Sequence, residues 1–307
     1  MNQPTLHGQV TRLLSGFYTV QNEHGTWVCR LRGRLKKQRT QGDILALGDR
    51  VQFIPLPDGT GVIEAVEPRT HALVRMAPTA RGEYQQVLLA NPDQVVFVFS
   101  CANPAPRLGM LDRFLVIAEQ QGIPPLIVAN KNDLVTAEEA RRLFTEYPPL
   151  GYPVIYTSVK TGEGIPQLHA CLKGKLSALA GPSGVGKSSL LNAIQPELGL
   201  AVREVSQATS KGRHTTVIRQ MFPLKDGGYV ADLPGLRMLA LWDVQPEELD
   251  GYFPELRERV QQCAFNDCTH RSEPGCAVQA ALQNGEISPR RYQSYLRMRF
   301  GEEEEES

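Results

Sequence analysis

The 307-residue chain contains no apolar run long enough to span a membrane and no N-terminal leader with an apolar core. Its 33 basic and 33 acidic residues cancel, so the net charge alone argues against a strongly acidic partner such as a nucleic acid. It has only six cysteines, and Cys29, Cys101 and Cys171 are isolated, which is not typical of a secreted domain held by disulfides. We therefore expect a cytoplasmic protein that does not associate with a membrane.

Three glycines within eight residues mark a complete phosphate-binding loop, residues 181–188. Glycine lets successive backbone N–H groups approach phosphate oxygens, Lys187 adds positive charge, and the Ser188 hydroxyl suits Mg²⁺. The neighbouring residues predict a strand over 176–180 and a helix over 189–194 whose N-terminus faces the anion, a context that a simple glycine turn does not require. The predicted phosphate-binding residues are Gly181, Ser183, Gly184, Val185, Gly186, Lys187, Ser188 and Ser189.

A guanine-recognition sequence, Asn-Lys-x-Asp, follows an apolar strand predicted over 125–129. An ionised Asp133 only accepts hydrogen bonds, so it can receive the two donors on the edge of guanine, which adenine lacks. Asn-Lys-x-Asp also occurs in ordinary surface turns. The segment 157–162, which is similar to the Ser-Ala-Lys loop that supports guanine, favours the nucleotide interpretation. The predicted base-binding residues are Asn130, Lys131, Asp133, Ser158 and Lys160.

Two more segments follow the phosphate loop. Asp232-Leu233-Pro234-Gly235 ends a strand over 229–231 and would place Asp232 near Mg²⁺ and the Gly235 N–H near the γ-phosphate, although a plain strand-ending turn is the alternative. The polar segment 210–216 predicts a first switch in which Thr215 or Thr216 binds Mg²⁺, and a strand is predicted after it, over 217–222. In ordinary GTPases the phosphate loop comes before Asn-Lys-x-Asp, so the inverted order predicts a circularly permuted GTPase.

The residue that would position the attacking water is missing. Leu236 follows Gly235 where a Ras-like enzyme carries glutamine, and leucine cannot orient water. We therefore expect slow hydrolysis by the free protein. His214 is the nearest candidate catalytic residue, although a histidine in a loop is commonly just exposed to solvent.

A cluster of potential metal ligands lies near the C-terminus, in the pattern Cys-x4-Cys-x-His-x5-Cys. Three thiolates and one imidazole fill a tetrahedral zinc shell and leave no position for water, so the predicted Zn²⁺ is structural. Disulfides are the alternative. The predicted ligands are Cys263, Cys268, His270 and Cys276.

The sequence predicts a multidomain α/β protein. Short alternating runs in residues 1–70 indicate an N-terminal antiparallel barrel. Residues 71–240 alternate strands and helices, as a P-loop GTPase domain with a mixed sheet and flanking helices would. Residues 241–307 combine the metal cluster with two expected helices and end in an acidic run, 302–306, that we expect to be disordered. Because residues 232–235 end the middle domain, a γ-phosphate contact there could reposition the C-terminal domain.

Basic residues are unevenly distributed in spite of the zero net charge, since one ten-residue segment holds six of them and no acid. Arg30, Arg32 and Arg34 alternate, so a strand would place them on one face. Trp27 and Tyr18 would lie beside this patch. A solvated charged surface is the alternative, but such a patch on a barrel favours RNA binding. The predicted RNA-binding residues are Arg30, Arg32, Arg34, Lys36, Lys37 and Arg39.

The order of the motifs resembles that of one known family. Asn-Lys-x-Asp, Ser-x-Lys, the phosphate loop, His-Thr-Thr, Asp-x-Pro-Gly and the cysteine–histidine pattern follow one another as in the RsgA (YjeQ/EngC-type) family of small ribosomal subunit biogenesis GTPases. The likeness extends to residues 111–115, Leu-Asp-Arg-Phe-Leu, and to the N-terminal barrel. Val159 replaces the usual alanine of the Ser-Ala-Lys loop, where backbone contacts tolerate the change.

The resemblance implies an OB-fold, a circularly permuted GTPase domain and a zinc-binding domain that together bind the immature small (30S) ribosomal subunit and its rRNA. It implies action late in maturation, with GTP and Mg²⁺, and release as GDP forms in ribosome-stimulated hydrolysis. We expect a monomer. Two alternatives stay open: a non-catalytic GTP-dependent RNA-binding switch, which the missing glutamine favours, and a GTPase that acts on another RNA or on translating ribosomes.

Overall fold

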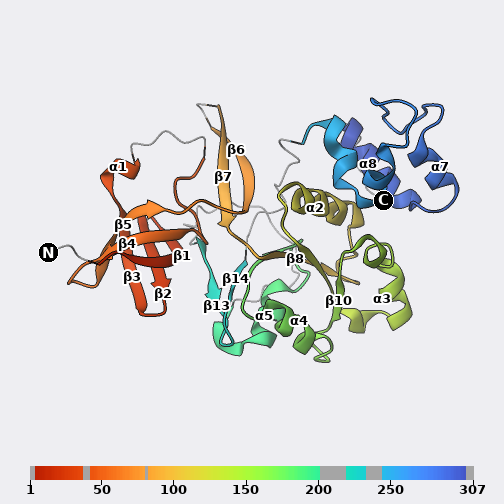
Figure 1. The fold of residues 1–307 in the computed structure, drawn as a ribbon. Helices are drawn as coiled ribbons and strands as arrows, with labels where there is room; N and C mark the ends of the chain where they lie inside the picture. The colour runs from red at the N-terminus through yellow and green to blue at the C-terminus, as the bar shows by residue number, and fades with distance from the viewer. Residues whose placement is uncertain (1–3, 37–41, 80–81, 201–218, 233–243, 302–307) are drawn as a thin grey trace.

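The structure is a computed structural model that describes residues 4–36, 42–79, 82–200, 219–232 and 244–301. Three parts follow one another along the chain: a barrel, a sheet covered by helices, and a group of C-terminal helices (Figure 1). No helix in these ranges combines the length and the apolar character needed to cross a bilayer.

The N-terminal part is a closed barrel of five strands. All neighbouring pairs are antiparallel except β3 with β5, and pairing of β1 with β4 closes the barrel. Alternate residues point inward, and Val10, Val20, Val51, Phe53 and Ile63 are fully buried there. The strands, in spatial order, are β1 (Leu6–Leu14), β2 (Phe17–Asn22), β3 (Gly25–Leu31), β5 (Thr60–Val66) and β4 (Arg50–Pro55).

A hairpin of β6 (Ala72–Thr79) and β7 (Gly82–Ala90) connects the barrel to the central sheet (Figure 1). The loop before β4 touches the end of this hairpin, where the Ala90 N–H donates to the Leu47 carbonyl at 2.7 Å. Gly48 has φ +82°, and a Cβ there would lie 2.1 Å from the Ala90 carbonyl oxygen, so only glycine permits this approach.

The central sheet has six strands, all parallel except β13, which pairs antiparallel with β14 at one edge. In β8 and β11 every residue is buried, as expected of parallel strands covered on both faces. The strands, in spatial order, are β10 (Val154–Thr157), β9 (Pro125–Asn130), β8 (Gln94–Ser100), β11 (Leu176–Ala180), β14 (Tyr229–Asp232) and β13 (Phe222–Pro223).

Alternation along β8 builds two cores. Phe97 and Phe99 face the layer of α2 (Leu108–Gln120) and α3 (Ala137–Leu143). Val96 and Val98 face the layer of α4 (Ile165–Leu172) and α5 (Lys187–Ile194). Short 3₁₀ turns complete the connections: η1 (Asn132–Leu134), η2 (Pro148–Leu150) and η3 (Pro196–Leu198).

The C-terminal part packs a small core of its own against α2. Phe253, Leu256 and Tyr295 are fully buried in this core, together with Val116 from α2. Its elements are η5 (Pro246–Tyr252), α6 (Pro254–Val260), α7 (Ala277–Gln283) and α8 (Pro289–Phe300). In Figure 1 they lie above α2, on the side of the sheet away from α4 and α5.

A buried polar anchor fastens α8 to α2. The carboxylate of Asp112, which is fully buried, accepts hydrogen bonds from Arg290 Nη1 at 2.7 Å, Arg291 Nη1 at 2.8 Å and Ser294 Oγ at 2.6 Å. Arg291 also donates from Nε to Glu255 at 2.7 Å. Burial alone would raise the pKa of Asp112, but the two arginines outweigh it and hold that pKa below its ordinary value.

The predicted multidomain architecture is confirmed: a five-stranded N-terminal barrel, an α/β domain with a mixed sheet and flanking helices, and a C-terminal helical region that carries the cysteine–histidine cluster. The structure differs from the single strand predicted over 217–222. Its described part forms two short strands, β12 (Arg219–Gln220) on the barrel and β13 on the central sheet. The buried side chain of Met221 lies at the crossing between them.

Candidate functional site

The phosphate-binding loop connects β11 to α5, as predicted. Gly181 has φ +149°, and a Cβ there would lie 2.1 Å from the Val98 carbonyl oxygen. Gly186 has φ +94°, and a Cβ there would lie 2.5 Å from Asn130 Nδ2. Both glycines therefore let the loop pass close to neighbouring groups in conformations that other residues avoid. The Lys187 ammonium donates to the Gly181 and Pro182 carbonyls, at 2.9 Å each.

Side chains of the Asn-Lys-x-Asp segment hold the phosphate loop directly. The buried Asn130 donates from Nδ2 to the Val185 carbonyl at 2.8 Å, and Lys131 Nζ donates to the Gly184 carbonyl at 2.7 Å. Burial lowers the pKa of Lys131, and nearby Asp133 opposes the shift. Because parallel strands end at one edge of the sheet, segments more than fifty residues apart are brought into one site.

Asp133 is held from the next loop, which follows β10. Ser158, a fully buried residue, donates from its hydroxyl to Asp133 Oδ1 at 2.7 Å. Asp133 itself is exposed, as are Val159 and Lys160 in the same region. A carboxylate has four lone-pair sites, so this single bond leaves Asp133 able to accept further donors.

Asp232 ends β14, directly beside Leu179 of β11. Its Oδ1 atom is buried and has no hydrogen-bond partner. Burial raises the pKa of Asp232, while Lys187 opposes the shift. A buried, unpartnered carboxylate oxygen is costly unless a cation or its water completes the site, so Asp232 and the half-buried Ser188 fit Mg²⁺. The other residues predicted for this chemistry, His214, Thr215, Thr216 and Gly235, lie outside the described ranges.

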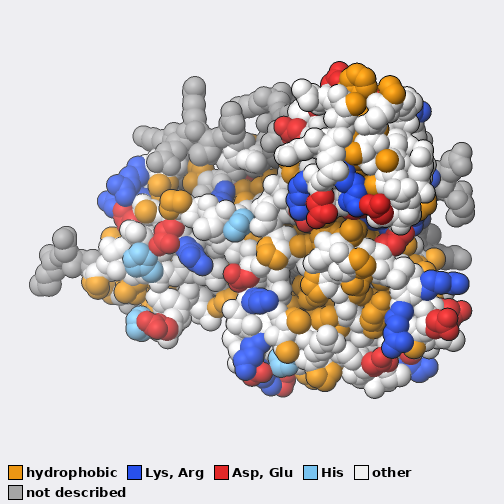
Figure 2. Space-filling view, turned by 45° about the vertical axis from the view of Figure 1, so that its right-hand side comes forward, with side chains coloured by type: hydrophobic (Ala, Val, Ile, Leu, Met, Phe, Trp, Pro, Cys, Tyr) orange, Lys and Arg blue, Asp and Glu red, His pale blue; other side chains and the backbone are white. Residues whose placement is uncertain are grey.

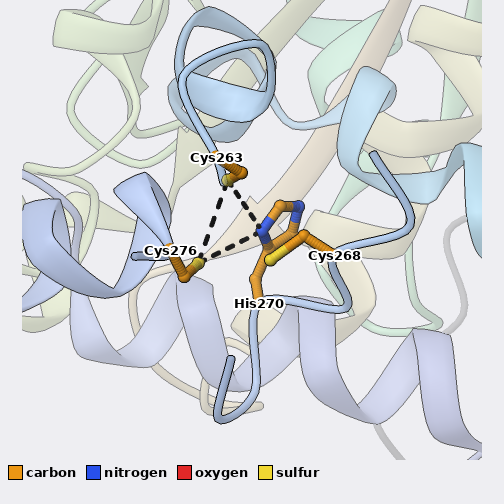
Figure 3. Close-up of side chains that lie close together, drawn as sticks. All are labelled: Cys263, Cys268, His270 and Cys276. Atoms are coloured by element: carbon orange, nitrogen blue, oxygen red, sulfur yellow. Dashed lines mark hydrogen bonds between the residues drawn. The ribbon is translucent and has the colours of Figure 1, made fainter. Parts of the chain in front are cut away.

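The four predicted metal ligands converge in the C-terminal part (Figure 3). Their ligand atoms lie within 4.8 Å of one another. The Sγ atoms of Cys263 and Cys276 are 4.0 Å apart, and His270 Nδ1 is 3.6 Å and 3.4 Å from them. Tetrahedral zinc with Zn–S bonds of about 2.3 Å separates sulfurs by about 3.8 Å. The cluster is therefore compatible with a closed zinc site, and all six cysteines are free thiols.

Two acidic residues that sequence reasoning missed support this cluster. Asp250 faces the other ring nitrogen of His270, with Nε2 and Oδ2 3.1 Å apart, which orients Nδ1 toward the thiols. Glu273 accepts from the backbone N–H groups of Thr269 and Arg271. Burial opposes ionisation of Glu273, but these and related hydrogen bonds lower its pKa to about 2. Nothing in their spacing could have distinguished them from surface acids.

The predicted basic patch is arranged differently from the expectation. β3 ends at Leu31, so Arg30 points out from the strand, but Arg32 follows it and Arg34 lies in α1 (Gly33–Lys36). The strand that would place all three arginines on one face therefore ends before Arg32. Leu35 is the reason, because it turns into the barrel core and makes the segment helical. Arg32 and Arg34 both pair with Glu64.

The rest of the predicted basic patch consists of Lys36, Lys37 and Arg39. Lys36 ends α1, and Lys37 and Arg39 lie outside the described ranges. Figure 2 shows Lys and Arg side chains interspersed with acidic ones over the face it draws.

A different aromatic residue lies on the outer surface. Trp27 and Tyr18 pack against the barrel core rather than beside the arginines. Phe17 is 40% exposed instead, and the Arg30 guanidinium lies over its ring at 4.6 Å. The alternation of exposed and buried residues in β2 and β3 could have indicated this pair.

A phosphate loop on β11, a base-recognition segment on β9 and a carboxylate on β14 define a GTPase whose chain order is circularly permuted. The profile of the RsgA GTPase family matches residues 66–242, and that of the RsgA N-terminal domain matches residues 7–63. The chain belongs to the RsgA family. Membership implies GTP hydrolysis with Mg²⁺.

Individual relatives agree over nearly the whole chain. The "Small ribosomal subunit biogenesis GTPase RsgA" of Gemmatimonas aurantiaca is 45% identical and that of Moorella thermoacetica 44%, each over 95% of this chain and 96% and 95% of the relative. The crystal structure of YjeQ from Thermotoga maritima matches with a TM-score of 0.80 and 39% identity over 97% of this chain and 98% of that one. YloQ, described as a circularly permuted GTPase, matches with a TM-score of 0.75 and 32% identity over 97% and 95%.

Proposed function

We propose that the protein is a cytoplasmic, monomeric GTPase that binds the small ribosomal subunit, assists its late maturation and leaves when GTP is hydrolysed. The main structural support is that Asn130 and Lys131 bond directly to the phosphate loop, which builds one site for base and phosphates. The relatives' names supply the ribosomal partner. The proposed functional domains are residues 1–70, 71–240 and 241–307.

The nucleotide would bind along the carboxyl ends of β9, β10, β11 and β14. Asp133, held by Ser158, reads guanine, while Asn130, Lys131 and Lys160 frame the base. The phosphate loop, with Lys187, holds the phosphates, and its carbonyl contacts give way to phosphate oxygens. Ser188 and Asp232 hold Mg²⁺ and its waters, with Thr215 or Thr216 from the first switch, and the Gly235 N–H approaches the γ-phosphate.

The barrel and the C-terminal part would bind rRNA. The exposed Phe17 under Arg30 suits stacking of an unpaired base, and the remaining predicted basic residues, Arg32, Arg34, Lys36, Lys37 and Arg39, would contact phosphates. The pairing of Arg32 and Arg34 with Glu64 lowers their share of this interaction. Arg30 is thus the strongest candidate among the described basic residues.

Zinc would hold the C-terminal loops together, and we expect one Zn²⁺ per purified chain. Cys268→Ala should lose the metal and unfold the C-terminal region, because binding to such sites supplies on the order of 10 kcal/mol of folding free energy. GTP affinity should change by less than about twofold, since the site lies on other elements. Elemental analysis measures the zinc content, and hydrogen exchange measures unfolding of the C-terminal region. Cys171→Ala, outside the cluster, is the control, and full zinc content in Cys268→Ala would remove Cys268 from the ligand set.

Turnover measured with and without small subunits tests the function. Leu236 cannot position water, so the free protein should be slow, and added subunits should stimulate it by ordering the first switch. His214→Ala should bind GTP and subunits normally but lose about 100-fold or more of the stimulated rate, and should accumulate on subunits. His169→Ala, another histidine of this domain, is the control.

The outcomes separate the candidates. An unchanged stimulated rate in His214→Ala would move water positioning to a ribosomal group. No turnover with saturating subunits, together with nucleotide-dependent co-sedimentation, would establish the non-catalytic switch instead. Stimulation by another RNA or by translating ribosomes, but not by isolated small subunits, would establish a different target.

A further inference from the structure

Five consecutive residues tie the barrel to the central sheet. Arg219 and Gln220 form β12, which pairs with Leu13 and Arg12 of β1, and the Met221 N–H donates to the Thr11 carbonyl at 2.8 Å. The next two residues form β13, which pairs with β14. Met221 itself is buried in the core that α2 and the central sheet share. A displacement of either sheet is therefore transmitted to the other through this segment, which we name the tie (residues 219–223).

The tie lies between two elements of the proposed nucleotide site. On one side, β14 continues from the β13 pairing to Asp232, the proposed Mg²⁺ residue. On the other side, only two residues of sequence separate Arg219 from Thr216, one of the two threonines proposed to bind Mg²⁺. Loss of the γ-phosphate changes contacts at this type of site, so both ends of the tie are positioned to respond.

The tie extends an exposed face of the barrel. β12, β1, β2 and β3 are consecutive neighbours in one sheet. On their outer side Leu14 is directly opposite Phe17, which lies under Arg30. Val28 is 46% exposed on the same side, and Arg12, opposite Gln220, is exposed as well. Apolar and aromatic groups between two arginines offer stacking and charge to an unpaired RNA strand. We name these residues the outer face: Arg12, Leu14, Phe17, Val28 and Arg30.

The two flanking parts are attached to the central sheet in unequal ways. The C-terminal part is held by the buried Asp112 anchor, in which two arginines and a serine surround one carboxylate. The barrel is held by hydrogen bonds of the loop before β4, at Asp43, Leu47 and Gly48, and by a strand of two residues at the edge of a sheet. Of these attachments, the strand of two residues lies closest along the chain to the proposed nucleotide site, so a change of nucleotide reaches it most directly.

We infer that pairing of β12 with β1 differs between the GTP and GDP states and so sets the affinity of the outer face for rRNA. The inference rests on the proposed function and adds its regulation. It assigns the response to the barrel, in contrast to the repositioning of the C-terminal domain that the sequence suggests. Because coupling between sites is reciprocal, rRNA on the outer face would also change GTP affinity.

A reversible crosslink tests this inference. The Met221–Thr11 bond makes Arg12 and Gln220 a non-hydrogen-bonded pair, and the Cα separation of about 4.5 Å in such pairs suits a disulfide. Arg12→Cys with Gln220→Cys should therefore lock β12 to β1 when oxidised by glutathione disulfide and release it with dithiothreitol. Affinity for small subunits is measured with GDP and with a non-hydrolysable GTP analogue. We expect the ratio of the two affinities to be on the order of 10 in the reduced protein and about 1 in the oxidised protein.

The controls separate this inference from the proposed function. Oxidised Gln220→Cys alone, which keeps the outer face intact, should keep the ratio and accounts for effects on the native cysteines. The reduced double variant accounts for the lost arginine. An unchanged ratio in the oxidised double variant would overturn the inference, as would a ratio near 1 in the reduced protein. Subunit binding and GTP turnover are recorded in every sample. If both persist while the inference is overturned, the proposed function still holds. If the reduced protein never binds subunits, the proposed function fails and the inference with it.

Discussion

Asp133→Asn should lose GTP affinity by about 100- to 10,000-fold. Asp133 is proposed to accept two donors from guanine, and each hydrogen bond to a charged group contributes about 1.5–3 kcal/mol. Asparagine can accept one donor but presents its amide N–H groups to the other. Xanthosine triphosphate carries a 2-oxo group that accepts such a donor, so the variant should bind it better than the parent protein does. Fluorescent-nucleotide titration measures both affinities.

Two features make this test sharp. Ser158 still has an oxygen to donate to in the variant, so the loop that follows β10 should keep its place. Asp226→Asn, an exposed aspartate of the same domain paired with His169 at 3.5 Å, is the matched control and should bind GTP normally. If Asp133→Asn bound GTP like the parent protein, the assignment of base recognition to this residue would be wrong.

Arg291→Met should destabilise the C-terminal part by about 3–5 kcal/mol, since it leaves the buried Glu255 without its partner. Methionine has a similar length, so most of the loss comes from the unpaired charge rather than from a cavity. Urea unfolding and hydrogen exchange of α8 would measure the effect. GTP affinity should stay within about twofold, because Arg291 lies outside the nucleotide site.

The chain offers both a control and a rescue for this substitution. Arg257 crosses the same interface to Glu119 at 3.3 Å, but its side chain is 54% exposed, so Arg257→Met should cost less than about 1 kcal/mol. Adding Glu255→Gln to Arg291→Met should recover part of the loss, because it removes the unpaired carboxylate. If Arg257→Met and Arg291→Met lowered the free energy of unfolding equally, burial of the anchor would add no stability beyond that of an exposed ion pair.

The features predicted from the sequence are those whose signal is local. The phosphate loop and the strand before it are contiguous, so glycine spacing and an apolar run were enough to predict them. The cysteine–histidine cluster is equally compact, and its convergence in the structure follows from fourteen residues of chain. The fold class was predictable for the same reason, since the motifs themselves define the order of the strands.

Features that depend on distant partners were missed. Asp112 stood out in the sequence only as part of a family likeness, because the arginines that surround it lie 178 and 179 residues away. Arg34 was assigned to a strand because alternation of charge cannot show that Leu35 has a place in the barrel core. Residues 217–222 were predicted as one strand, because nothing in that short segment indicates the change of partner at Met221.

The distance along the chain between contacting residues also determines which parts of the protein can fold during translation. All five strands of the barrel lie between residues 6 and 66, so the barrel can close while most of the chain is still being synthesised. The central sheet needs β14, which ends at Asp232, and α8 reaches Asp112 only when the chain is nearly complete. Long-range contacts of this kind form late because they close large loops. A nascent chain therefore has a folded barrel well before the tie, which connects the barrel to the nucleotide site, has been synthesised.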